Sequence, residues 1–140
     1  MRELKPKVKT WRKHVENGFI KNNTERVLHE IYSKTIFSMS ISTDELRSKL
    51  AISHQSLTAI LSILQDEGVI HVVGEKSVNS SYFSLWEYTT HEEDIVKFKR
   101  IREIEKLEAW IKRGAYEFDH LLPDQLVNEL LFLADRKNIS

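Results

Sequence analysis

The chain has 140 residues, of which 41% are hydrophobic and 30% are charged, a composition typical of a soluble globular protein with room for a core. It contains no cysteine, which excludes disulfide bonds, thiolate chemistry and cysteine-based zinc sites and fits a cytoplasmic protein. The 21 basic and 21 acidic residues cancel, so their distribution is more informative than the net charge.

The two ends of the chain carry opposite charge. Residues 1–13 have a net charge of +5 and residues 114–140 have a net charge of −3, which suggests surfaces for two different partners. The basic N-terminus is followed by no apolar run, and no apolar stretch approaches the roughly 20 residues of a membrane span. We therefore expect neither a signal peptide nor a membrane partner.

Residues 1–23 are expected to form a basic arm with a short helix that is broken near Gly18. The first strongly marked helix begins at residues 23–25, where Thr24 is the expected N-cap, and apolar residues at helical spacing continue it to Lys34. Residues 36–41 alternate apolar and polar side chains, a pattern that predicts a short strand.

Two helices joined by a tight turn come next. Residues 42–45 provide a hydroxyl cap and two acidic residues, which open a short helix that ends near Ala51. Ser53 is placed to cap the following helix, and Gly68 is a typical C-terminal stop for it. The two helices have apolar stripes that are expected to be buried, formed by Leu46, Leu50, Ala51, Leu57, Ile60, Leu61 and Leu64.

A hairpin and two more helices complete the pattern. Residues 69–73 and 82–86 are predicted strands on either side of a polar loop at residues 74–81, and Trp86 is expected in the core. A long helix begins at residues 91–94 and is expected to end near residue 113, closed by Gly114. A last helix is expected after Pro123.

Three segments, in this order, resemble the winged helix-turn-helix family. Residues 43–50 (TDELRSKL) are similar to the first helix of the motif, residues 52–57 (ISHQSL) to its turn and the start of the recognition helix, and residues 64–70 (LQDEGVI) to the exit into the wing. The resemblance implies a mainly α fold with a small β-hairpin wing. It divides the chain into the arm at 1–23, a winged helix-turn-helix domain at 24–90 and a C-terminal helical extension at 91–140 that is available for dimerisation.

This resemblance implies a DNA-binding face, because the recognition helix of the motif enters the major groove. The residues expected to read DNA are Ser53, His54, Gln55, Ser56 and Thr58. Glutamine pairs with adenine through two hydrogen bonds, and serine or threonine contacts bases or phosphates. The expected wing contacts are Lys76 and Asn79, beside the neighbouring minor groove or backbone.

The charge of this region argues against tight DNA binding by the motif alone. Residues 36–90 have six acidic and three basic residues, a net charge of −3, and the recognition helix has no lysine or arginine. Much of the free energy of DNA binding comes from cations that displace counterions at phosphates. A flexible arm can supply them, and its cations are Lys5, Lys7, Lys9, Arg12 and Lys13. A second possible source is the long helix, through Lys97, Lys99, Arg100 and Arg102.

No motif indicates catalysis. The six histidines are scattered, the four glycines look like helix or strand breakers, and no phosphate-binding loop or nucleophile turn is present. The acidic residues 92–94 lie where a helix N-terminus favours negative charge. We therefore predict that the protein is not an enzyme and needs no metal or cofactor.

Two functions stay open. The first is a small transcriptional regulator that binds double-stranded DNA as a homodimer, with a layout similar to MarR-type and PadR-type regulators and an apolar dimer surface within residues 92–137. The second is a protein-interaction module, such as a phage or plasmid accessory protein in replication or transcription. The acidic winged-helix region and the acidic tail favour a protein partner. Trp110 is expected to pack on the last helix or on a second subunit.

Overall fold

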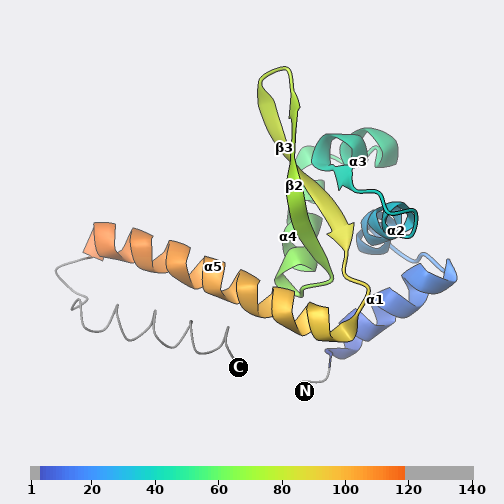
Figure 1. The fold of residues 1–140 in the computed structure, drawn as a ribbon, viewed down its shortest axis with the longest axis horizontal. Coiled ribbons are helices and arrows are strands. Elements are labelled where there is room, and N and C mark those ends of the chain that lie inside the picture. The colour runs from blue at the N-terminus through green and yellow to red at the C-terminus, as the bar shows by residue number, and fades with distance from the viewer. Residues whose placement is uncertain (1–3, 119–140) are drawn as a thin grey trace.

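The computed structural model describes residues 4–118 and has a mainly helical fold with one small sheet. This confirms the predicted fold class. In chain order the elements are α1 (Pro6–Asn17), α2 (Asn23–Thr35), β1 (Ile41–Ser42), α3 (Thr43–Leu50), α4 (His54–Asp66), β2 (Ile70–Val78), β3 (Ser81–Tyr88) and α5 (Glu92–Phe118). The β2–β3 hairpin stands out from the helices, and α5 crosses the base of the molecule (Figure 1).

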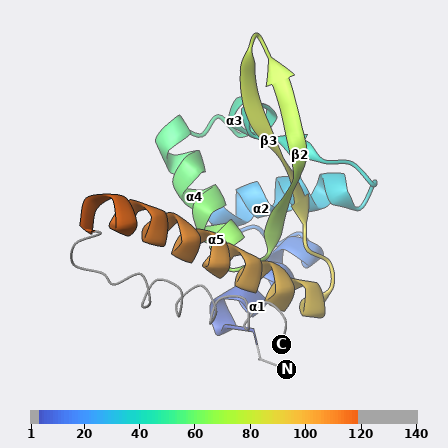
Figure 2. The ribbon, with the colours of Figure 1, turned by 60° about the vertical axis from the view of Figure 1, so that its left-hand side comes forward.

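The sheet is antiparallel with the strand order β1-β3-β2. The short strand β1 joins the outer side of β3 through the pairs Ile41–Trp86 and Ser42–Leu85. The order α2-β1-α3-α4-β2-β3 with this pairing is consistent with a winged helix-turn-helix. Figure 2 shows α4 beside the hairpin, with one end of α4 next to α5.

The predicted strand at 36–41 is wrong except at its last residue. Residues 36–39 form a turn after α2, in which the amides of Phe37 and Met39 donate to the carbonyl of Lys34. Ile36, Phe37 and Met39 are more than half exposed. The alternation was misleading because a period of two indicates a strand only when its apolar side chains reach a core.

The predicted polar loop at 74–81 is also wrong, because most of it is paired strand. β2 runs to Val78 and β3 starts at Ser81, so the loop consists of Asn79 and Ser80. Both have positive φ, 49° and 68°, as a tight two-residue hairpin turn requires. Polar residues here mark a ribbon with two exposed faces. A register shift between Val72 and Gly74 adds a bulge to β2.

Two helix boundaries differ from the prediction, and two hydroxyl caps are confirmed. The N-cap of α2 is Asn22 and not Thr24, because the extended backbone of Asn22 places its side-chain oxygen 2.9 Å from the amide of Glu25. Ser42 and Ser53 cap α3 and α4 as expected. Helix α5 continues through Gly114 to Phe118, because one glycine inside a long helix costs only about 1 kcal/mol relative to alanine.

The core lies beneath α3 and α4 and extends to α1. Val8 and Val15 of α1 are buried in one cluster with residues of α2, α4 and the sheet. Trp86 is buried as predicted, and its ring nitrogen donates to Thr43 Oγ1 at 2.9 Å. Residues 6–17, which the sequence suggested as part of a basic arm, therefore form a packed helix. The predicted last helix and most of the acidic tail lie outside the described residues.

Candidate nucleic-acid interface

The turn between α3 and α4 makes the first residues of α4 protrude. Ala51 takes the left-handed conformation at φ 54° and ends α3. Ile52 is buried, and Leu46 and Leu57 are fully buried beneath the turn. Because this apolar contact fixes the crossing of the two helices, the N-terminal half of α4 is a rigid platform.

The predicted reading residues share this platform. Leu57, Leu61 and Leu64 face the core. The five predicted residues, Ser53, His54, Gln55, Ser56 and Thr58, are all exposed at the start of α4. Ser53 accepts from the amide of Ser56 at 3.3 Å, and its hydroxyl donates to that of Ser56 at 3.0 Å. These two hydroxyls therefore serve the cap. His54, Gln55 and Thr58 make no side-chain hydrogen bond within residues 4–118 and remain available.

Ile63 was missed in the sequence. It lies on α4 one turn beyond Ala59 and is 45% exposed. An apolar sequence stripe does not reveal which aliphatic residue of a helix faces outward. Its exposure adds an apolar point to a helix surface with no charged residue between positions 53 and 65.

The wing places its one cation against α3. Lys76 Nζ lies 3.0 Å from Glu45 Oε1, across 31 residues of chain. This hydrogen bond lowers the pKa of Glu45 and raises that of Lys76, so both groups are charged at neutral pH. Asn79 is exposed at the hairpin tip. The Lys76 charge is thus partly neutralised before any ligand binds.

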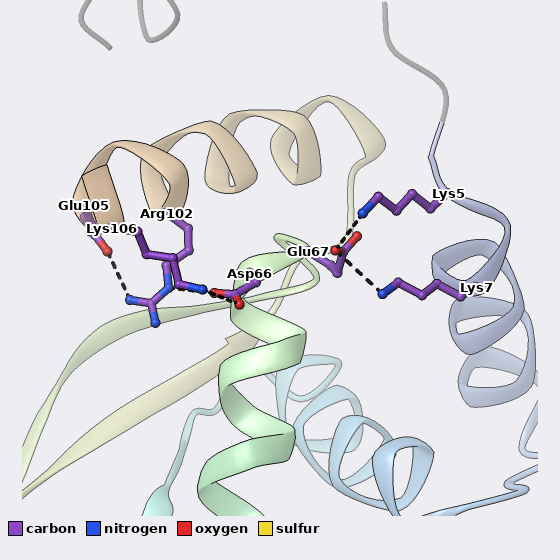
Figure 3. A network of polar contacts seen from close by, with 7 residues as sticks. All are labelled: Lys5, Lys7, Asp66, Glu67, Arg102, Glu105 and Lys106. Carbon is purple, nitrogen blue, oxygen red and sulfur yellow. Dashed lines mark hydrogen bonds and ion pairs between the residues drawn. The ribbon is translucent and has the colours of Figure 1, made fainter. Parts of the chain in front are cut away.

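The five arm cations do not lie beside the reading residues. Lys5 and Lys7 lie 3.2 and 3.8 Å from Glu67 Oε1, at the far end of α4 (Figure 3). Arg12 donates to the carbonyls of Thr89 and Thr90 at 2.7 and 2.9 Å. Lys9 and Lys13 line a shallow hollow next to Glu92, where α5 begins. Because α4 has 13 residues at about 1.5 Å each, about 20 Å separate its two ends.

Three cations of the long helix also lie at the far end of α4. Lys99 lies 3.8 Å from Glu67, and Arg102 lies 3.0 Å from Asp66. Lys106, which was not singled out in the sequence, lies 2.6 Å from Asp66 (Figure 3). Lys97 lies 5.7 Å from the ring centroid of Phe98. The structure therefore gathers basic residues of α1 and α5 around two carboxylates of α4.

Three other cations lie close to the turn, and sequence reasoning did not select them. Arg26 of α2 donates to the carbonyl of Leu50, the last residue of α3, at 3.0 Å. Arg47 of α3 is exposed and has no ion-pair partner among the described residues. Lys49 pairs with Glu30 at 2.5 Å, and its side chain is 56% exposed. The polar face of α3 could have indicated Arg47 and Lys49, whereas Arg26 reaches the turn only through tertiary packing.

The part of the chain that the structure describes contains no group of three or more His, Asp or Glu side chains that could hold a metal ion. None of its helices is long and apolar enough to cross a lipid bilayer.

Comparisons with known proteins leave the family open. No family model matches this chain, and neither does any curated protein. Among solved structures, one described as "Crystal Structure of a transcriptional regulator" aligns with 94% of this chain and 88% of its own, with 16% identity and a TM-score of 0.39. A similarity of this size carries no argument about function.

Proposed function

We propose that this protein binds double-stranded DNA as a small regulatory protein and that the N-terminal half of α4 reads the major groove. The observation that carries the proposal is the rigid, protruding start of α4. There His54, Gln55 and Thr58 are exposed and free to bond with base edges. Short neutral side chains on a fixed helix suit a groove about 12 Å wide.

The cations near the turn are the proposed phosphate contacts. In helix-turn-helix proteins the first helix of the motif crosses the DNA backbone while the second enters the groove. Here that first helix is α3, and its exposed cations are Arg47 and Lys49, with Arg26 beside its end. We expect them to contribute more than the α1 lysines, which lie near the opposite end of α4. The wing would add Lys76 and Asn79.

A salt series tests DNA binding directly. Fluorescence anisotropy would be measured with a random-sequence duplex pool and with duplexes enriched from it, between 50 and 200 mM salt. We expect binding at low salt and a linear fall of log K against log salt, with a slope of about −0.9 for each phosphate contact. No binding at the lowest salt would rule out this function.

We propose further that the DNA-binding form is a homodimer that uses α5. The C-terminal half of α5 extends beyond α4 and the sheet (Figure 1), and Trp110 on it is 47% exposed. Light scattering is expected to give twice the chain mass of 16.5 kDa. A constant 16.5 kDa at high concentration would contradict the dimer and leave α4 to act alone.

A protein partner is the second candidate, and one observation favours it. The exposed surface of α4 has no Asp, Glu, Lys or Arg before Asp66 and includes Ile63, while Lys76 and Lys49 are already paired with Glu45 and Glu30. Such a surface resembles the apolar centre of a protein interface more than a phosphate-binding groove. If DNA binding is absent, replacing Ile63 with aspartate would test this candidate by loss of the partner complex.

A further inference from the structure

The C-terminal end of α4 is attached to the flanking helices by two adjacent carboxylates. Asp66 is bound by Arg102 and Lys106 of α5, at 3.0 and 2.6 Å. Glu67 is approached by Lys5 and Lys7, at the start of α1 (Figure 3). Ion pairs between residues so far apart in sequence fix how the helices meet and do not stabilise any single helix.

A second attachment lies earlier on α5. Gly68 follows α4 with φ +78°, and a Cβ placed there would lie 2.3 Å from the carbonyl oxygen of Ile95 and 2.9 Å from the amide of Lys99. The two backbones are therefore in close contact. In the same part of α5 the Phe98 ring stacks on His71 of β2, with centroids 3.9 Å apart. Residues 95–99 are thus packed against both the end of α4 and the sheet.

Two attachments along α5 determine its angle relative to α4, whereas a single attachment would leave α5 free to pivot. The Gly68 attachment is centred near residue 97 and the Asp66 attachment near residue 104, so about 10 Å of helix axis separates them. The apolar cluster of the core includes no α5 residue, so packing in that cluster does not hold the helix at the Asp66 attachment. At the Asp66 attachment, the ion pairs with Arg102 and Lys106 connect α5 to α4.

We propose that Asp66 is a positioning residue that sets the angle between the recognition helix α4 and α5. Its consequence for DNA rests on the proposed function: in a dimer built through α5, this angle determines the distance between the two α4 helices, which must match one turn of DNA, about 34 to 36 Å. The angle itself is a property of the free protein and is measurable without DNA.

The Asp66 carboxyl group is ionised at neutral pH, as its ion pairs with α5 require. Burial by itself raises the pKa of Asp66, but the hydrogen bonds and charges of Lys106 and Arg102 outweigh burial, so the pKa lies below its usual value. Asp66 is therefore ionised at neutral pH. Its side chain is 31% exposed and that of Lys106 is 53% exposed. Ion pairs this exposed contribute little to global stability, so the effect of the charge is expected mainly in the helix angle.

Double electron–electron resonance on the free protein tests this proposal. The chain has no cysteine, so Ala59→Cys on α4 and Ala109→Cys on α5 give two specific spin-label sites, both exposed. Labelled protein is diluted with an excess of unlabelled protein to remove distances between copies. Ala109 lies about 15 Å along α5 from residue 99, so a rotation of about 15° moves it by about 4 Å.

Asp66→Asn is compared with the matched control Glu105→Gln. Glu105 pairs with Arg102 at 3.6 Å within α5 and forms no hydrogen bond or ion pair with α4 among the described residues, so its variant removes one carboxylate from the same network and keeps the attachment. We expect the distance distribution to broaden or shift by several ångströms in Asp66→Asn and to stay unchanged in Glu105→Gln. An unchanged distribution in Asp66→Asn, or an equal change in both variants, would overturn the proposal.

A second variant keeps the test decisive if Asp66→Asn does not fold. Arg102→Gln with Lys106→Gln removes the same ion pairs from the exposed side of α5, and the same broadening is expected. An unchanged distribution in that variant would overturn the proposal. DNA anisotropy on the same samples separates the two claims. If the distance distribution changes in the variants but the parent protein binds no DNA, the proposed function is refuted and the positioning role of Asp66 stands.

Discussion

At the scale of single residues, Gln55 is the side chain on which the proposed reading of DNA depends most directly. It is exposed on the first turn of α4 and makes no hydrogen bond within the described residues. Replacing it with alanine removes a partner for a base edge without touching the core. We expect the preferred site to lose about 1 to 3 kcal/mol of binding free energy, while non-specific binding and the salt slope stay nearly unchanged.

The matched control for this variant is Gln65→Ala, which removes the same amide from the opposite end of the same helix. Competition anisotropy with specific and random duplexes measures both variants. If Gln55→Ala binds the preferred duplex as tightly as the parent does, this face is not the reader of DNA, and a protein partner becomes the better interpretation of α4.

His71 gives the fold a predicted pH dependence. Its ring stacks on Phe98 with an interplanar angle of 5°, and Nδ1 lies 2.8 Å from Thr89 Oγ1. Burial lowers the pKa of His71 below 6.5, and Glu87 and Asp94 oppose this shift only in part, while Lys97 adds to it. The unfolded chain therefore binds this proton more readily than the folded one. The His71 contribution to stability is present above pH 6.5 and is lost as the pH falls below that value.

Urea denaturation at pH 7.5 and pH 5.5 measures this effect. We expect the parent protein to lose stability between the two values and His71→Gln to lose less. His54→Gln serves as control, because His54 is exposed at the start of α4 and has no contact of this kind. Equal losses in the parent and in His71→Gln would assign the pH dependence to other groups.

At the scale of elements, the contact between α4 and α5 depends on a glycine. Gly18 and Gly68 have nearly the same φ, +79° and +78°, but a Cβ at Gly18 would meet no atom within 4 Å. Gly18→Ala therefore isolates the cost of the left-handed backbone, about 1 to 2 kcal/mol. Gly68→Ala adds a clash with the backbone of α5, for which we expect about 1 to 3 kcal/mol more. Chemical denaturation measures the unfolding free energy of both variants. Equal losses would show that α5 moves away from the added Cβ without a measurable loss of stability.

Local signals predicted most of the elements, and tertiary contacts explain what they missed. Ser42, Ser53 and Gly68 mark helix ends through hydrogen bonds and backbone preferences that depend on neighbouring residues only, so their positions were predictable. The turn at Ile36 to Met39 was mistaken for a strand because exposure is not visible in an alternating pattern. The bonds of Lys5 to Glu67 and of Lys76 to Glu45 span 62 and 31 residues, and no spacing in the sequence indicates them.

The same reasoning explains the candidate site. The exposure of the proposed reading residues was predictable because they lie almost consecutively at the start of one helix. The cations proposed to bind phosphates were not predictable, because the total charge of a segment does not show where each cation lies in the fold. Arg47 and Lys9 look alike in the sequence, but one lies near the start of α4 and the other lies near the start of α5.

At the scale of the whole molecule, this arrangement predicts which cations determine the salt dependence of DNA binding. Arg47→Ala with Lys49→Ala is expected to weaken binding to all duplexes and to reduce the salt slope by about 0.9 for each lost phosphate contact. Lys9→Ala with Lys13→Ala removes the same charge from α1 and is expected to change the slope less. A larger change of the salt slope in the Lys9 and Lys13 variant would assign the phosphate contacts to the N-terminal residues, as the sequence suggested.

The central claim is that DNA contacts the start of α4, and backbone amide NMR during a DNA titration tests it most directly. With an enriched duplex and ¹⁵N-labelled protein, we expect the largest early shifts at residues 53–59, smaller ones at Arg47, Lys49 and the hairpin tip, and little change at Val15 and Ile31 in the core. Shifts confined to α1 or to the outer face of α5, with residues 53–59 unchanged at saturation, would contradict the claim.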